Sequence, residues 1–275
     1  MRVHRGVTCW CVLAVCLAGG VARAGVVVET EQREPGSTTA AGRALYSIDA
    51  GRLRIEARSS EGEETLVIFR ADKSVAWIIN QQDRTYYEIT PAKVAQMKQQ
   101  MEAAQRQMAA ELEKMPPDQR KMVEEMMTRM GQRPGSNPPP YIVRAAGRGE
   151  KVGSFVCTRY EILRGSERTG ELWAASVEQL KLGPEDFKTF SDLAKLFEPL
   201  GQQGPMGQLA GLKPLGSGGE TIEGYPVRTL TYDGGRLVQE EVVVRAEQQT
   251  FDNKLFELPS GLRKTELNMQ APDEP

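Results

Sequence analysis

Histidine and cysteine are nearly absent from this 275-residue chain. It has one histidine, His4, and four cysteines, of which only Cys157 lies beyond residue 16. The chain after residue 24 therefore cannot build a Ser-His-Asp or Cys-His catalytic arrangement, a histidine metal site or a cysteine zinc cluster. One cysteine also excludes an internal disulfide. We expect Cys157 to be a small buried hydrophobe, with an intermolecular disulfide or a redox role as the alternative.

A basic block is also lacking. The 35 basic and 37 acidic residues are interspersed and give a net charge of −2, so nucleic-acid binding has no electrostatic footprint. The glycine-rich stretch 201–219 has no GxGxxG or GxxxxGK[ST] spacing, which leaves a phosphate cradle unsupported. The carboxylate pairs Glu124-Glu125 and Glu240-Glu241 lie among other charges, and we interpret them as solvated faces. We expect a protein that is not an enzyme, with no catalytic residue, cofactor or metal.

Residues 1–24 are typical of a secretory signal peptide. A basic start, MRVHR, precedes the apolar run GVTCWCVLAVCLAGGVA, and Ala22 to Ala24 form a small-x-small cleavage site. The apolar run is short for a membrane span of about 20 residues. The alternatives are a membrane anchor and lipid attachment at Cys16. We expect cleavage after Ala24, a periplasmic or secreted protein, and no transmembrane anchor after cleavage.

The body of the chain alternates apolar and polar residues, as strands do. β-Branched and aromatic residues are separated by turn residues, which predicts two groups of short strands. The expected strand regions are 26–32, 44–57 and 65–89, and then 141–147, 154–175 and 225–247. In one strand of the first group Val75, Trp77 and Ile79 share a face, because side chains alternate in direction.

Between the two groups the apolar period becomes helical. Pro91 suits a first helical turn, and Pro116-Pro117 ends one helix and starts another. This predicts a helical hairpin over 91–130, which holds eight of the eleven methionines, followed by a Pro-rich linker at 131–140. A short amphipathic helix is expected at 184–200.

The methionines allow three interpretations. They pack as core, they line a pocket for an apolar ligand, or they bind Cu(I) through thioethers. A curved sheet with one apolar face needs a cover, so we expect the hairpin to be a lid over that face. The residues expected to line the space beneath it come from two strands and from the second helix: Val75, Trp77, Ile79, Trp173, Met122, Met126 and Met130.

Longer segments carry a resemblance. The segments VIFRADKSVAWIINQQDRTYYEIT, MPPDQRKMVEEMM, VCTRYEI, GELWAA and FELPSGL resemble an uncharacterised family of exported bacterial proteins, the domain-of-unknown-function family 4412. That family is similar to LolA-like periplasmic lipoprotein carriers. The resemblance implies an α+β fold with a single strongly curved antiparallel sheet, an unclosed barrel whose concave side is covered by helices. It also implies an apolar cavity able to hold an acyl chain, and it carries over no catalytic residue.

These observations give one organisation and two functions. The signal peptide covers 1–24, a LolA-like curved-sheet domain covers 25–264, and 265–275 form a disordered tail. The first function is a non-enzymatic periplasmic binding protein that holds a lipid or a lipoprotein acyl chain in an apolar cavity. The alternative is an envelope interaction or scaffold protein with a filled core, no ligand and a protein partner.

Overall fold

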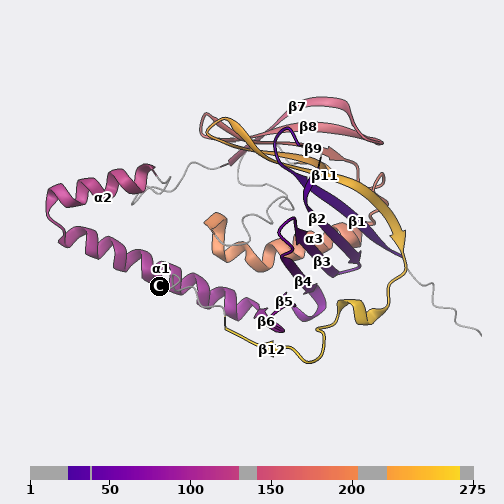
Figure 1. Ribbon diagram of the computed structural model, residues 1–275, viewed down its shortest axis with the longest axis horizontal. Coiled ribbons are helices and arrows are strands. Elements are labelled where there is room, and N and C mark those ends of the chain that lie inside the picture. The colour runs from indigo at the N-terminus through magenta and orange to yellow at the C-terminus, as the bar shows by residue number, and fades with distance from the viewer. Residues whose placement is uncertain (1–23, 38, 130–140, 204–221, 267–275) are drawn as a thin grey trace, which may run out of the picture.

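The computed structural model describes residues 24–37, 39–129, 141–203 and 222–266, and it has an α+β fold. One open sheet of twelve strands curves around α3 (Pro184–Phe197), and two further α-helices of the described residues, α1 (Pro91–Lys114) and α2 (Pro117–Arg129), extend away from the sheet (Figure 1). The expected fold class, a single curved and unclosed antiparallel sheet with helices, is confirmed. The Pro-rich linker at 131–140, most of the 201–219 stretch, and the signal peptide up to residue 23 lie outside the described residues, as does the tail after residue 266.

The sheet has two halves that meet at the N-terminal strand. Its order is β12-β6-β5-β4-β3-β2-β1-β11-β10-β9-β8-β7, antiparallel except that β12 runs parallel to β6. The first half contains β1 (Gly25–Arg33), β2 (Ala40–Asp49), β3 (Arg52–Ser59), β4 (Glu64–Arg70), β5 (Val75–Asn80), β6 (Thr85–Ile89) and the short β12 (Arg263–Lys264). The second half contains β7 (Tyr141–Val152), β8 (Phe155–Arg164), β9 (Glu167–Ala175), β10 (Tyr225–Asp233) and β11 (Arg236–Gln249).

The hairpin turns contain residues with positive φ. Ala50 and Gly51 connect β2 to β3 and both have positive φ, 39° and 85°. Gly234 and Gly235 connect β10 to β11 with φ of 54° and 75°, a conformation that glycine adopts without steric cost. The local sequence therefore fixes which strands pair as hairpins. It leaves open which face of the sheet is covered.

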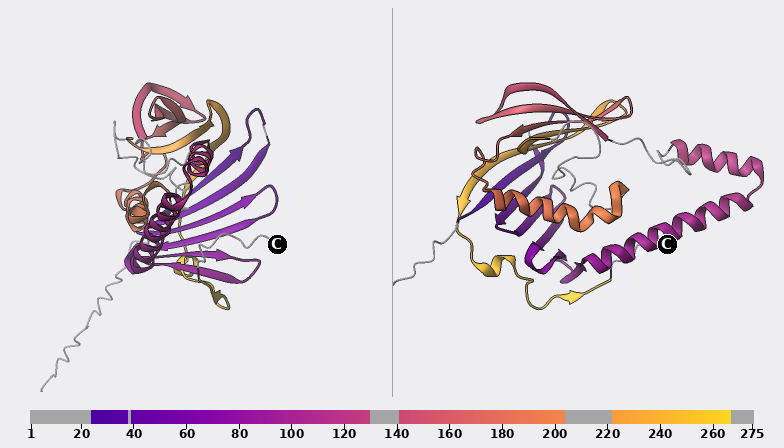
Figure 2. Two further views of the ribbon diagram at one scale, coloured as in Figure 1. Left: turned by 90° about the vertical axis from the view of Figure 1, so that its left-hand side faces the viewer. Right: turned by 180° about the vertical axis from the view of Figure 1, so that it is seen from behind.

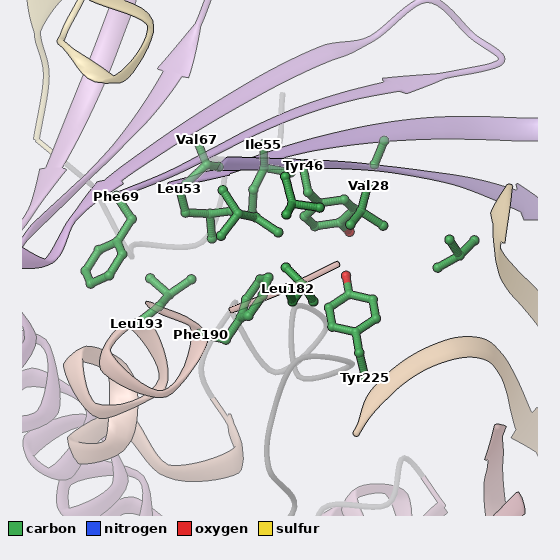
Figure 3. Packing of buried hydrophobic residues seen from close by; sticks show 14 of the residues in the cluster. Val28, Tyr46, Leu53, Ile55, Val67, Phe69, Leu182, Phe190, Leu193 and Tyr225 are labelled. Carbon is green, nitrogen blue, oxygen red and sulfur yellow. The ribbon is translucent and has the colours of Figure 1, made fainter. Parts of the chain in front are cut away.

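The inner face of the sheet is the face that packs against α3 (Pro184–Phe197). In the first half, paired residues of β2, β3 and β4 point to this face, among them Tyr46 opposite Ile55 and Ile55 opposite Val67. Phe190 and Leu193 of α3 pack against them, and all are buried (Figure 3). This cluster continues across β1 into the second half, so the inner face is a packed core rather than an open trough in the part that α3 covers.

The outer face of the first half is covered by the end of the chain. Leu66, Ile68, Val75, Trp77 and Ile79 form a second buried cluster there. Leu258 and Leu262 pack over it, after a short 3₁₀ turn at Asn253–Phe256. Since the chain crosses from β11 back over this half, its C-terminal segment is a structural cover and not a loose extension (Figure 2).

The two remaining helices form a hairpin. α1 (Pro91–Lys114) is capped by Thr90, whose side-chain oxygen accepts a hydrogen bond from the Lys93 backbone N–H at 3.3 Å. α2 (Pro117–Arg129) follows after a break at residues 115 and 116. Val94 and Met97 are buried against the core, but beyond residue 101 nearly every described side chain is exposed. We call residues 102–129 the arm, because this part of α1 extends away from the sheet and α2 folds back from its tip (Figures 1 and 2).

The tip of the arm is held by one arginine. Arg120 donates from Nε to the Leu112 carbonyl at 3.0 Å and from its terminal nitrogen to the Glu113 carbonyl at 2.8 Å. These carbonyls are among those that the end of a helix leaves without intrahelical partners. Arg120 therefore connects the end of α1 to the start of α2. None of the described helices is long and apolar enough to cross a membrane.

Candidate functional site

The arm presents methionines to solvent. Met122 and Met126 lie four residues apart on α2, so they share one side of that helix, and their side chains are 64% and 55% exposed. Met108 of α1 is 49% exposed. We call Met122 and Met126 the methionine face. The prediction that Met122 and Met126 close over the inner face is wrong, because α3 and the first turns of α1 fill that position; Met130 lies outside the described residues.

Single exposed apolar side chains are normal on a folded surface, and Ile142, Val156, Val238 and Val244 of this chain are exposed as well. Met122 and Met126 differ from a single residue because they lie next to each other on one helix. Apolar side chains are usually buried, and exposed groups of them mark contact surfaces. Methionine is flexible and polarizable, so it packs against partners of irregular shape. The charged residues of the arm are exposed as well, for example Lys114 and Glu111, which pair at 2.9 Å. The arm therefore exposes both apolar and charged side chains to solvent.

The predicted lining residues do not come together. The register places Val75, Trp77 and Ile79 on the outer face, where Leu258 covers them, whereas Trp173 belongs to the inner cluster. Their expected common face is thus corrected, because a strand alternates between two faces and its sequence does not say which one the helix covers. Whether any of these residues contacts a ligand stays a prediction.

Trp173 is held by charged neighbours. Its indole N–H donates to Glu150 Oε2 at 2.6 Å, and the Arg228 guanidinium lies 4.8 Å from its ring centroid. Arg228 in turn pairs with Glu240 at 2.7 Å. Such contacts orient the ring and leave its indole nitrogen satisfied. Trp173 thus has a structural explanation without a ligand.

A buried glutamate cross-links the second half of the sheet. The Glu171 side chain is 7% exposed. Its carboxylate forms ion pairs with Arg159 at 3.0 Å and Arg168 at 3.5 Å, and it accepts a hydrogen bond from the Tyr232 hydroxyl at 2.5 Å. Burial and this carboxylate raise the pKa of Tyr232. Because the charges are paired, this network ties β8, β9 and β10 together. Within the described residues there is no group of three His, Cys, Asp or Glu side chains arranged to hold a metal ion.

A cavity of about 240 Å³ lies at the base of α1, between the edge of β6 and the C-terminal segment. Two ion pairs flank it, Lys93 with Glu266 and Lys264 with Glu88, each at 2.5 Å. The Lys264 ammonium and the Trp77 indole hold the pKa of Glu88 below its usual value. The lining of the cavity is mixed, since Ile89 and Met97 lie beside the charged residues of the two ion pairs. The cavity contains none of the predicted lining residues, so it is not the apolar pocket that the sequence predicted.

Cys157 is buried and forms no disulfide. Its side chain is 2% exposed, and burial raises the pKa of the thiol above its usual value. A protonated, shielded thiol is a poor nucleophile. The prediction of a small buried hydrophobe is confirmed.

The sequence pattern predicted the wrong environment for Glu241. It lies half-buried on the inner face, and burial raises the pKa of its carboxyl group. The prediction of a solvated Glu240-Glu241 pair is therefore wrong for Glu241, while Glu240 does pair with Arg228. The run QEEVVV has valines at both alternating sets of positions, so the pattern gives no sign that one glutamate points inward.

Comparisons with known proteins give a family and some distant structures. The family model described as "Domain of unknown function (DUF4412)" matches residues 115–262. No curated protein matches the chain. One similar solved structure is the complex of Pseudomonas aeruginosa MucA and MucB, with a TM-score of 0.36, 8% identity, and coverage of 88% of this chain and 58% of that chain. Another, MucB alone, has a TM-score of 0.36, 9% identity, and coverage of 88% and 60%. The chain thus spans less than two thirds of these proteins.

Proposed function

We propose that this chain, which belongs to the DUF4412 family, is a non-enzymatic binding protein of the cell envelope that holds an apolar segment of a partner protein on its methionine face. The observation that carries this proposal is the exposure of Met108, Met122 and Met126 on an arm that leaves the sheet. An apolar helix in a groove or against a helix face is a recurrent mode of recognition, read by residues four apart. Met122 and Met126 have this spacing.

Two features favour a protein segment over a lipid. The inner face beneath α3 is packed with side chains such as Phe190 and Leu193. The methionine face is also open, whereas sites for small apolar ligands are concave and bury most of the ligand. An arm that projects from the domain can meet a second protein without rearranging the core.

Export and the lack of catalysis rest on the sequence. Residues 1–24 have the basic start, apolar run and small-x-small site of a signal peptide. Beyond them the chain has no histidine and only Cys157, whose burial removes it from chemistry. A binding role needs neither a histidine nor a reactive cysteine. The envelope is thus the compartment in which we place the partner.

Photo-crosslinking in intact cells tests the proposal. A photoreactive phenylalanine at Met126 should crosslink to one protein of defined mass, and the same probe at Lys121 of α2 should not, since Lys121 points away from the methionine face. A Met122→Asp change should weaken the crosslink from position 126, because it puts a charge into the apolar contact. Crosslinks to lipid alone, or equal crosslinks from positions 121 and 126, would refute a protein-binding methionine face.

A further inference from the structure

The cavity of about 240 Å³ at the base of α1 lies where three distant parts of the chain meet, and we call it the basal cavity. Its lining comes from the end of β6, from the first two turns of α1, and from β12 and the residues that follow it. A cavity of roughly 150 Å³ is large enough to bind benzene, so the basal cavity has room for a small organic molecule. The side chains of Lys264 and Glu266 in its lining are 49% and 76% exposed, so the cavity opens to solvent on that side.

The basal cavity has a cationic part and an apolar part. Lys93 and Met97 both line it and are four residues apart on α1, so they lie on one side of the helix, about 6 Å apart along its axis. Met97 and the neighbouring Ile89 are buried, which makes this part of the lining apolar. Ligand sites commonly combine an apolar lining with a few polar groups that fix the orientation of the ligand. The cavity therefore suits a molecule with one charged group on a short apolar stem.

The start of α1 adds to the positive charge of the basal cavity. Thr90, Ala92 and Lys93 all line the cavity. Pro91 has no N–H, and the Lys93 N–H donates to the Thr90 side chain at 3.3 Å, so the Ala92 N–H is the donor of this turn that the helix geometry leaves without an intrahelical acceptor. The dipole of the helix also favours a negative group at this end. These features and the Lys93 ammonium group together favour an anion.

The two ion pairs of the cavity differ in how firmly the glutamate is held. Glu88 accepts hydrogen bonds from Lys264 at 2.5 Å and from the Trp77 indole N–H at 3.2 Å, and its side chain is 30% exposed. Glu266 accepts from Lys93 at 2.5 Å, but its side chain is 76% exposed, whereas that of Lys93 is 24% exposed. Because exposed ion pairs contribute little stability, a solute can replace Glu266 at Lys93. Lys93, Lys264 and Glu88 then leave a net charge of +1, which one carboxylate neutralises.

We infer that the basal cavity binds a small organic monocarboxylate, whose carboxylate takes the place of Glu266 at Lys93 and whose apolar stem lies beside Ile89 and Met97. Charge-assisted hydrogen bonds from the lysine hold the carboxylate, and removal of the stem from water adds to the affinity. Glu266 acts as an internal competitor for the same lysine. The site is separate from the methionine face and does not rest on the function proposed for it.

Titration calorimetry with sodium hexanoate on the mature protein tests the site. Wild-type protein should show saturable binding at a stoichiometry of one. Lys93→Gln should weaken binding by at least about tenfold, because charge-assisted hydrogen bonds to the carboxylate are lost. Glu266→Gln should bind hexanoate more tightly than wild type, because the internal competitor loses its charge. The matched control is Lys98→Gln, which removes a lysine of the same helix that pairs with Glu102 at 3.9 Å, and it should bind as wild type.

Two further measurements separate this site from unspecific binding. Hexanamide, which has the same stem without the charge, should bind at least about tenfold more weakly than hexanoate. In NMR spectra of protein with labelled methionine methyl groups, hexanoate should shift the signal of Met97 and leave that of Met126 unchanged. Circular dichroism checks that each variant is folded.

The inference has outcomes that would overturn it. They are the absence of saturable binding to folded wild type and to Glu266→Gln, unchanged binding to Lys93→Gln, weaker binding to Glu266→Gln than to wild type, equal binding of hexanamide, and an unshifted Met97 signal. Opposite effects of the two substitutions on affinity would support it, because loss of the ion pair alone removes the same contact in both variants.

Discussion

Replacing Asp186 should loosen the helix that fills the inner face. Asp186 is only 2% exposed. Its carboxylate accepts hydrogen bonds from the backbone N–H groups of Ala50 at 3.0 Å and Gly183 at 2.9 Å. One turn later, Thr189 Oγ1 accepts the Gly51 N–H at 2.8 Å. The first turn of α3 is thus fastened to the β2–β3 turn, and the acidic side chain also caps its own helix.

The expected loss follows from those two bonds. A hydrogen bond to a charged group contributes about 1.5–3 kcal/mol, and loss of a helix cap costs about 1 kcal/mol. Ala50 is exposed, so water can replace the carboxylate at its N–H. We therefore expect Asp186→Ala to lower the free energy of unfolding by about 2–4 kcal/mol. Asp186→Asn, which keeps one acceptor oxygen, should cost about half as much.

Thermal and urea unfolding monitored by circular dichroism measure this loss. For a domain of this size, about 2–4 kcal/mol corresponds to a fall in Tm of roughly 4–16 °C. The matched control is Asp192→Ala on the same helix, which removes surface ion pairs with Lys188 and Lys195 and should cost less than about 1 kcal/mol. A similar cost for Asp186→Ala and Asp192→Ala would show that α3 is held loosely, and the view of the inner face as a fixed core would then fail.

Four further outcomes are expected. Met126→Asp should change stability by less than about 0.5 kcal/mol in urea unfolding, because the side chain is 55% exposed; a loss of several kcal/mol would place it in a core. Glu241→Gln should be more stable than wild type at pH 7. Burial raises the pKa of Glu241, so the folded protein favours the protonated carboxyl group and is destabilised when that group ionises. The stability gain of the variant should shrink as pH falls through the raised pKa toward 4.5, and an equal gain at pH 7 and pH 4.5 would contradict this prediction. Cys157 should react with a thiol reagent only after denaturation, and rapid labelling of native protein would refute its burial. Intact-mass measurement of exported protein should give a chain that begins at Gly25, whereas a retained Met1 would disprove cleavage after Ala24.

The strands and helices could be predicted because local chemistry fixes them. Pro91 and the Pro116-Pro117 pair mark the bounds of α1, which runs from Pro91 to Lys114, and the alternation over 65–89 marks β4, β5 and β6. The curvature and openness of the sheet were implied by the resemblance to LolA-like proteins, whereas the hairpins and helices were predicted from the residues. These features depend on neighbours in the sequence.

The placement of side chains on faces could not be predicted in the same way. Trp77 is buried on the outer face because Leu258 and Leu262, some 180 residues later, return to cover it. The amphipathic pattern of residues 91–130 predicted that one side of the helical hairpin is apolar. The pattern does not reveal that α3 covers the inner face of the sheet, so it could not predict that the arm extends away from that face. Glu241 was likewise hidden, since its burial depends on Thr30 and Tyr46 of other strands.

Native mass spectrometry of the protein purified from its own envelope tests the central claim, that the methionine face of the arm binds a partner protein. The account predicts a complex whose mass is that of the chain plus a second polypeptide, and predicts that a Met122→Asp, Met126→Asp variant of unchanged stability is recovered without it. Recovery of wild-type protein bound only to a lipid, or of an undiminished complex with the double variant, would contradict the account.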